Sequence, residues 1–130
     1  MKMLVSAAAL AIAVSTSAFA QPAQMLTTVP TGKTIANYYK QNVYDPSNTK
    51  IGSIDDMLID DGGKVTSLIV GVGGFLGMGE KDVAVAFNAV HATMKDNKWY
   101  LTLNTTKDAL KAAPGFTYDS TKTAWVPAAK

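Results

Sequence analysis

Apolar and polar residues form short runs along most of the chain, and turn-forming residues separate these runs. Segments 51–59 and 65–72 are rich in β-branched residues, which favour strands. Between them, segment 60–63 contains two glycines, which adopt positive φ without a steric penalty. This pattern predicts a β-hairpin. An earlier β-type run over 35–43 leads into the Asp-Pro-Ser-Asn turn sequence at 45–48.

Segment 81–87 shows the most regular alternation in the chain. Val83, Val85 and Phe87 occupy every second position, and the positions between them carry small or polar residues. Successive side chains of a strand point to opposite faces of a sheet. The pattern therefore predicts a strand whose apolar face belongs to the core.

The second half of the chain predicts one more hairpin and one helix. Segments 90–94 and 99–103 flank turn residues at 95–97. Segment 105–114 begins with threonines that can cap a helix and ends in a proline, which predicts a helix of about two turns. Segment 115–130 contains aromatic residues among turn formers and is expected to carry little regular structure.

The first twenty residues have the pattern of a secretory signal peptide. Lys2 precedes an apolar run over 3–14, and Ala18 and Ala20 provide the small residues that signal peptidase requires. We expect cleavage before Gln21 and a periplasmic protein. The expected organisation is a signal peptide at 1–20, a flexible lead at 21–33, one domain at 34–118 and a tail at 119–130.

The composition narrows the possible chemistry further. The chain has no cysteine and one histidine, so it cannot form a disulfide, an iron–sulfur cluster or a zinc finger. Its formal charge is only +2, and Lys2 within the leader supplies one of these charges. All basic residues are lysines, and the lack of arginine argues against nucleic acid as a partner.

Several motifs taken together resemble a known family. They are Val-Tyr-Asp at 43–45, Lys-Ile-Gly-Ser-Ile at 50–54, Asp-Met-Leu-Ile-Asp at 56–60, Gly-Lys-Val at 63–65, and the glycine-rich stretch with the following strand at 70–85. This set closely resembles the PRC-barrel domain, and the whole chain is similar to the secreted single-domain members common in alphaproteobacteria. The likeness covers roughly 35–118.

The resemblance implies an all-β fold, a small antiparallel β-barrel with one short C-terminal helix. It also implies a docking or scaffolding role, because relatives use this domain as an interaction module and share no catalytic residues that could be transferred to this chain. We therefore expect a non-catalytic protein without a cofactor, with an unidentified protein partner that could lie at a membrane surface. Fold analogy alone cannot name that partner.

The glycine-rich stretch at 71–81 does not have the spacing of a nucleotide-binding loop. Counting from Gly71, a dinucleotide fingerprint requires glycine where the chain has Leu76. A P-loop counted from Gly74 reaches Gly79 and then requires lysine where the chain has Glu80. We therefore expect a barrel-corner loop and no nucleotide.

The same loop is the candidate contact surface, because it places three apolar side chains among glycines. The candidate partner-contact residues are Gly73, Gly74, Phe75, Leu76, Gly77, Met78 and Gly79. If the apolar side chains project into solvent they form a docking patch, and if they fold inward they plug the end of the barrel. The sequence leaves both arrangements open.

No other set of residues predicts catalysis or metal binding. The acidic residues Asp55, Asp56, Asp60, Asp61, Glu80 and Asp82 lack EF-hand spacing and are expected to be solvated at strand ends and turns. His91 has no partner motif, and no serine lies in a nucleophile elbow. A small-molecule or ion-binding barrel and an unrecognised hydrolase remain the alternatives to an interaction module.

Overall fold

The computed structural model describes residues 22–73 and 80–128. The chain divides into two units, Met1–Thr31 and Gly32–Lys130. In the first unit, the described residues 22–31 are exposed and form neither helix nor strand. Across both described ranges, no helix combines the length and the apolar character that crossing a bilayer demands.

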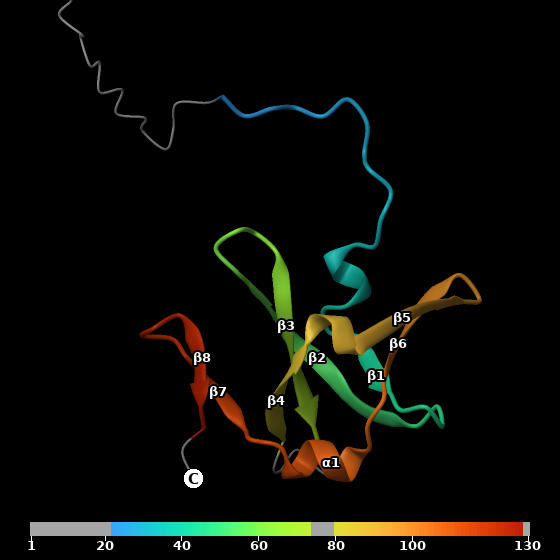
Figure 1. The fold of residues 1–130 in the computed structure, drawn as a ribbon, viewed down its shortest axis with the longest axis vertical. Coiled ribbons are helices and arrows are strands. Elements are labelled where there is room, and N and C mark those ends of the chain that lie inside the picture. Colours follow the sequence, from blue (N-terminus) through green and yellow to red (C-terminus); the bar gives the residue numbers. More distant parts are fainter. Residues whose placement is uncertain (1–21, 74–79, 129–130) are drawn as a thin grey trace, which may run out of the picture. The chain divides into compact units, whose positions relative to one another are not determined.

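The second unit is built on one eight-stranded sheet, shown in Figure 1. Its strands are β1 (Asn42–Tyr44), β2 (Lys50–Ile59), β3 (Val65–Val72), β4 (Lys81–Ala86), β5 (Val90–Lys95), β6 (Lys98–Leu103), β7 (Phe116–Asp119) and β8 (Ala124–Pro127). Two 3₁₀ helices, η1 (Ile35–Asn37) and η2 (Phe87–Ala89), and one α-helix, α1 (Lys107–Ala112), complete it. The strand order is β5-β6-β1-β2-β3-β4-β7-β8.

The expected fold class is confirmed as mostly β with one short helix, but two of its details differ. The pairing is not uniformly antiparallel, because β1 pairs with β6 in parallel. The chain reaches β6 through the β5–β6 hairpin, whose second strand runs in the direction of β1. In addition, β5 and β8 lie at the two ends of the strand order, and no ladder joins them in the part of the chain that is described.

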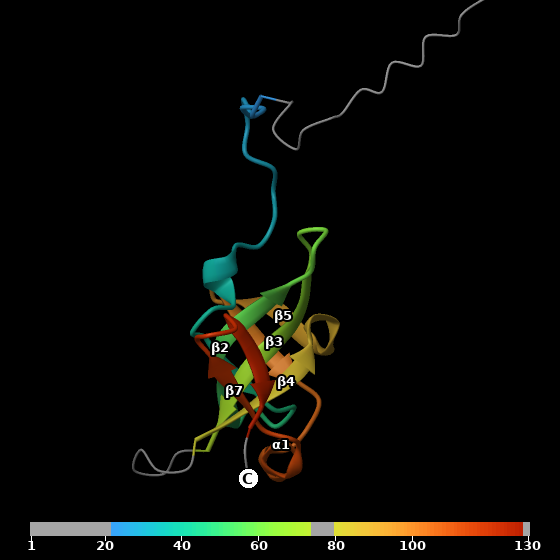
Figure 2. The same ribbon diagram turned by 90° about the vertical axis from the view of Figure 1, so that its left-hand side faces the viewer.

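The core lies on one face of β2, β3 and β4, which Figure 2 shows side by side, and it is completed by residues of β1, β5, β6 and α1. Val70 of β3 pairs with Ile54 of β2 and with Val83 of β4, and all three side chains are fully buried. Val85 and Phe87 pack against this core, so the predicted apolar face of segment 81–87 is confirmed. The buried residues of the core are Tyr38, Val43, Ile51, Ile54, Leu68, Val70, Val72, Val83, Val90, Leu101, Leu103 and Leu110.

The predicted turns and helix form for the expected physical reasons. Gly63 has φ +85° in the β2–β3 turn. One carboxylate oxygen of Asp60 accepts hydrogen bonds from the backbone N–H groups of Gly62 and Lys64, each at 2.9 Å. Thr106 caps α1 by accepting a hydrogen bond from the backbone N–H of Ala109 at 3.1 Å. These contacts satisfy donors that the backbone turns would otherwise leave unpaired.

Two segments differ from the sequence prediction. The β-type run over 35–43 forms η1 and only the first residues of the three-residue strand β1, because the backbone turns at Lys40, where φ is +66°. The segment after the helix is more regular than expected, since β7 and β8 form a hairpin. Its aromatic side chains Tyr118 and Trp125 pack edge to face with ring centroids 5.7 Å apart. Such cross-strand aromatic pairs stabilise short hairpins.

The position of Val83 in the core gives a direct test of the strand register. Replacing Val83, which is 1% exposed, with aspartate buries a carboxylate without a partner. We expect Val83→Asp to lower the free energy of unfolding by at least about 3 kcal/mol. The matched change Ala86→Asp, at an exposed position of the same strand, should cost less than about 1 kcal/mol. Urea unfolding measures both, and equal losses would contradict the register.

Candidate functional site

The connection between β3 and β4 leaves the sheet at Gly73 and returns at Glu80. Gly73 is exposed and has φ +88°, a backbone conformation that favours glycine. The other predicted contact residues, Gly74, Phe75, Leu76, Gly77, Met78 and Gly79, lie outside the described residues. The site is therefore built from the residues at the base of this connection.

Three carboxylates meet at that base, one each from Asp55, Glu80 and Asp82. One oxygen of each lies within 4.8 Å of the others. Asp55 comes from β2 and Asp82 from β4, on either side of β3, and Glu80 directly precedes β4. Asp55 thus meets two acidic residues that follow it by 25 and 27 positions in the sequence, and the cluster lies on the face of the sheet opposite the core.

A β-bulge at Asp55 places two consecutive aspartates on the face of β2 opposite the core. In the β2–β3 ladder, Ile54 pairs with Val70 and Asp56 pairs with Ile69, so Asp55 has no register partner. Asp55 follows the core residue Ile54, so the ordinary alternation of a strand turns its side chain to the face opposite the core. The extra residue turns Asp56 to the same face, beside its register partner Ile69. Oδ2 of Asp55 lies over β3, 2.5 Å from where a Cβ atom of Gly71 would be.

Gly71 provides the space in which the carboxylates meet. It pairs with Ser53 on one side and with Asp82 on the other. A Cβ atom at this position would lie 2.5 Å from Oδ2 of Asp55 and even closer to Oε1 of Glu80, both inside van der Waals contact. Glycine at position 71 therefore allows the acidic side chains to lie across β3.

The crowding changes the acidity of Asp82. Burial, and then the neighbouring Asp55 as a hydrogen-bond partner and as a negative charge, raise the pKa of Asp82 from its ordinary value of 3.8 to about 7. Glu80 adds a smaller repulsive effect, whereas the ammonium of Lys40 acts in the opposite direction. Oδ1 of Asp82 is buried without a hydrogen-bond partner in the described part of the chain. A shared proton between Asp55 and Asp82 relieves the repulsion between two adjacent carboxylates.

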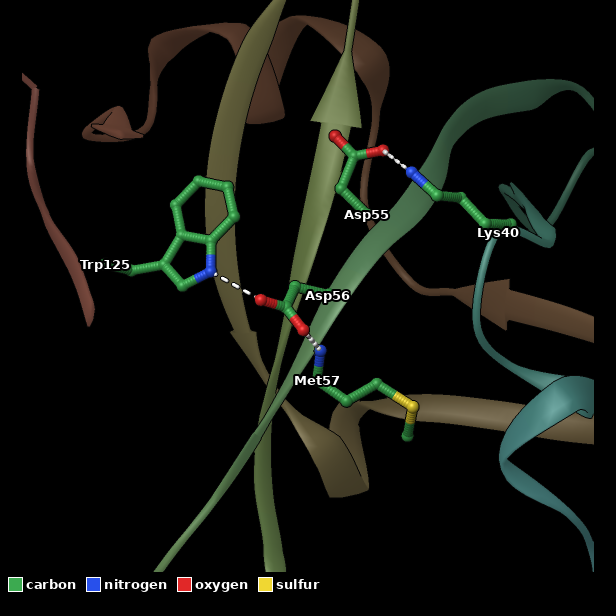
Figure 3. A network of polar contacts seen from close by, with 5 residues as sticks. All are labelled: Lys40, Asp55, Asp56, Met57 and Trp125. Carbon is green, nitrogen blue, oxygen red and sulfur yellow. Dashed lines mark hydrogen bonds and ion pairs between the residues drawn. The ribbon is translucent and has the colours of Figure 1, made fainter. Parts of the chain in front are cut away.

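Asp55 and Asp56 are consecutive but have separate partners, as Figure 3 shows. Nζ of Lys40 lies 4.0 Å from Oδ1 of Asp55, and the lysine side chain is largely exposed. Asp56 accepts a hydrogen bond of 2.7 Å from the indole N–H of Trp125 and one of 2.8 Å from the backbone N–H of Met57. The second aspartate therefore ties β2 to the β7–β8 hairpin, 69 positions away in sequence.

The expectation that all six acidic residues are solvated at strand ends and turns is correct for some and wrong for others. Asp60 and Asp61 lie in an exposed turn, as expected. Glu80 is exposed and directly precedes β4, also as expected. Asp55, Asp56 and Asp82 instead lie within strands and are half-buried, and Asp55 and Asp82 form the cluster with Glu80. The sequence contained one signal for this arrangement, which is Gly71. This glycine lies in β3, the strand that pairs with both aspartate-bearing strands, β2 and β4.

The arrangement can hold and exchange a proton near neutral pH. Its three oxygen atoms also have a spacing that a divalent cation could use. Acidic groups cluster on many protein surfaces without a metal, so the spacing alone assigns no ion here. His91 is exposed, and no described serine hydroxyl hydrogen bonds to it, so the residues considered for nucleophilic catalysis are not brought together.

A shallow hollow of about 320 Å³ adjoins the cluster. Its lining is mainly polar and is formed by Lys50, Ile51, Gly52, Ser53, Gly71, Gly73, Glu80 and Lys107. The hollow is open to solvent, and it lies at the same end of β3 as the 73–79 connection. The end of the β3–β4 hairpin thus combines charged groups with a concave surface.

Comparison with known protein families finds a match to one family. Residues 30–110 match the sequence model of the PRC-barrel domain, which is more than half of the chain. The matched region contains β1 to β6, the carboxylate cluster and most of α1. No curated protein matches the chain.

The raised pKa of Asp82 predicts how stability depends on pH. Between about pH 4 and pH 7 the folded protein retains a proton that the unfolded chain releases, so stability falls as the pH rises through this window. Asp82→Asn imitates the protonated form and should remove this decline. Because the side chain is partly exposed, we expect a gain of about 1 kcal/mol over the native protein at pH 8.

Urea unfolding at pH 4 and pH 8, in the presence of EDTA, measures this effect. At pH 4 the native protein and the Asp82→Asn variant should have similar free energies of unfolding. Asp61→Asn, at an exposed turn position outside the cluster, serves as the matched control and should leave the pH dependence unchanged. A variant at position 82 that keeps the native pH dependence would contradict the shared proton.

Proposed function

Because the chain belongs to the PRC-barrel domain family, we propose that it is a non-catalytic interaction module whose contact surface is the end of the β3–β4 hairpin. PRC-barrel domains are in general a non-catalytic fold family. The proposed contact residues are those at 73–79, with Phe75, Leu76 and Met78 as the apolar side chains. The partner is a protein, which the module holds in place without chemical turnover.

The observation that carries this proposal is the filled interior of the domain. Among the described residues, every fully buried side chain is apolar or a glycine, apart from the hydroxyl-bearing Tyr38, and no buried charged group is present. A catalytic or ligand-binding cavity normally presents a few polar groups inside an apolar pocket. The described hollows are instead open to solvent. This arrangement supports a function that depends on contacts at the surface of the domain.

Two observations favour the end of the β3–β4 hairpin as the contact surface. The residues on either side of the connection, Gly73 and Glu80, are exposed. Its three apolar residues stand between glycines, whereas surface connections normally carry polar side chains. Apolar residues presented in this way are typical of contact surfaces for proteins.

The alternatives have less support. A small-molecule barrel needs an internal cavity, and small barrels and sheets of this size are filled by their own side chains. Ion binding at the carboxylate cluster would have to displace the proton of Asp82 and overcome the ammonium of Lys40. A hydrolase would need a nucleophile beside a base, and the described serines and His91 do not provide one.

We further propose that this module works in the periplasm after cleavage before Gln21. The support is the leader pattern at 1–20, with its positive charge, its apolar run and its small residues before the cleavage position. A periplasmic location also agrees with a contact at a membrane surface, where a near-neutral module could approach without strong electrostatic repulsion.

A single substitution separates a docking loop from a loop that plugs the domain. We expect Phe75→Ser to leave the free energy of unfolding within about 0.5 kcal/mol of the native value, because a docking side chain is exposed in the free protein. The same change should reduce capture of the partner from a periplasmic extract by at least about tenfold. Urea unfolding and quantitative mass spectrometry of the captured proteins give the two readouts.

The matched control is Ile59→Ser, which removes another exposed apolar side chain at the opposite end of β2. This variant should be as stable as the native protein and should capture the same partner. A loss of about 2 to 4 kcal/mol for Phe75→Ser with unchanged capture would show that the loop is part of the core. That result would reject the proposed function.

A further inference from the structure

The β7–β8 hairpin is held together by its own contacts. Its ladder contains four register pairs, and it lies at one end of the strand order. In its turn, the carboxylate of Asp119 accepts hydrogen bonds from the backbone N–H and the hydroxyl of Thr121, at 2.9 and 2.6 Å. The edge-to-face contact of Tyr118 and Trp125 joins the two strands on one face. The hairpin can therefore move as one unit.

The hairpin has little attachment to the rest of the sheet. In the described part of the chain, the β4–β7 ladder has one register pair, Asp82 with Phe116, and no residue of the buried core comes from β7 or β8. An open hollow of about 700 Å³ lies between β4 and the hairpin, and Asp82 and Phe116 both line it. A second attachment is the 2.7 Å hydrogen bond from the indole of Trp125 to Asp56 (Figure 3). Each attachment thus involves an aspartate of the face opposite the core.

The connection from α1 to the hairpin provides a hinge. Nζ of Lys81 donates a hydrogen bond of 2.6 Å to the carbonyl oxygen of Lys111, and Leu110 is buried in the core, so α1 is fixed to the domain. Residues 113–115 follow the helix and belong to no helix or strand. Rotation about these residues would lift the hairpin from β4 and leave the core and α1 in place.

We propose that the β7–β8 hairpin is a pH-dependent flap, which closes on β4 when Asp55 and Asp82 share a proton and opens when that proton is lost. In the closed form, Oδ1 of Asp82 is buried without a hydrogen-bond partner in the described part of the chain. Such a position is costly for a charged carboxylate and less costly for a protonated pair. Opening separates Phe116 from Asp82 and admits water to this oxygen. The inference concerns a different part of the domain from the 73–79 connection and does not depend on the proposed function.

Three charged side chains act on the proton of Asp82. Asp55 and Glu80 favour its retention, whereas Lys40 favours its loss. Among the neighbouring elements, β3, β8 and η2 carry no titratable side chain. The other titratable residues of β2, β4, β7 and α1 are Lys50, Asp56, Lys81, Lys107, Asp108, Lys111, Tyr118 and Asp119. The hydrogen bond from Thr121 keeps the pKa of Asp119 below its ordinary value of 3.8, so the acid of the hairpin stays charged while Asp82 titrates.

The sign of the pH dependence follows from the two states of Asp82. With the hairpin closed, the pKa of Asp82 is about 7. With the hairpin open, water surrounds the carboxyl group and its pKa moves toward the ordinary value of 3.8. The closed form therefore binds the proton more tightly. The ratio of closed to open hairpin falls as the pH rises from about 4 to about 7, by up to about tenfold per pH unit, and is constant at higher pH.

The test is native-state hydrogen exchange of the whole protein, followed by NMR between pH 5 and pH 8 in the presence of EDTA. After correction for the intrinsic effect of pH on exchange, the backbone N–H groups of the β7–β8 ladder should lose protection by up to about tenfold per pH unit as far as pH 7. They should exchange at least about a hundredfold faster than those of the β2–β3 ladder. Low concentrations of urea should hardly change their exchange, because opening of the hairpin exposes little surface.

Two variants separate the proton from the second attachment. Asp82→Asn imitates the protonated form and should keep the hairpin closed, so its protection at pH 7.5 should exceed the native value by at least about tenfold. Trp125→Phe removes the hydrogen bond to Asp56 and should increase opening by about tenfold at every pH, with the pH dependence retained. The matched controls are Asp61→Asn in the exposed β2–β3 turn and His91→Gln, because histidine also titrates near neutral pH. Both controls should exchange like the native protein.

Thermal unfolding shows whether each variant is folded. If Asp82→Asn is not, Asp55→Asn replaces it and should move the pH dependence of the hairpin to lower pH, because Asp82 then lacks the carboxylate that raises its pKa. Equal exchange rates and equal responses to urea in the β7–β8 and β2–β3 ladders would show that the hairpin opens only with the whole domain, and this would overturn the proposal. Local opening that is the same at pH 5 and pH 7, or that keeps its native pH dependence in the Asp82 variant, would also overturn it.

Discussion

The lack of a side chain at Gly71 is the constraint on which the arrangement of this domain depends. Position 71 lies in β3 between β2 and β4, and the space that a Cβ atom would fill is taken by the carboxylates of Asp55 and Glu80. On the other side of the same strand pair, Gly52 approaches so closely that a Cβ atom there would lie 2.6 Å from the carbonyl oxygen of Gly71. Two glycines thus allow β2 and β3 to approach closely at this end, while apolar residues fill the core face nearby.

This close approach links the core to the surface chemistry. Asp55 faces Gly71 because it follows the core residue Ile54 in β2, and Asp82 meets it from the other side because it pairs with Gly71 in register. Asp56, after the bulge, lies on the same face as Ile69 and bonds to Trp125. The bulge in β2 therefore turns Asp56 to the face that already carries Asp55, so that one aspartate joins the acidic cluster and the next holds the C-terminal hairpin. The 73–79 connection begins two residues after Gly71, so its base is held by the same contacts.

Much of this fold could be predicted from the sequence, and the exceptions have physical causes. The β2–β3 hairpin, β4, the β5–β6 hairpin and α1 follow from local alternation, turn residues and capping, which act within a few residues. The β7–β8 hairpin was missed because a contact with Asp56, distant in sequence, helps to hold its short strands. The parallel β1–β6 pair and the acidic cluster likewise depend on tertiary placement, and alternation along one strand does not contain that information. The glycine-rich connection was found from sequence, but its partner remains a proposal.

The most direct test of this account is a carbon-13 NMR titration of the side-chain carboxyl group of Asp82 in the native protein. The account holds that the missing side chain at Gly71 leaves the space in which Asp55 and Asp82 come close enough to share a proton. It therefore predicts a titration midpoint for Asp82 of about 7. A midpoint near the ordinary value of 3.8 would show that the carboxylates are separate and solvated, and it would contradict the account.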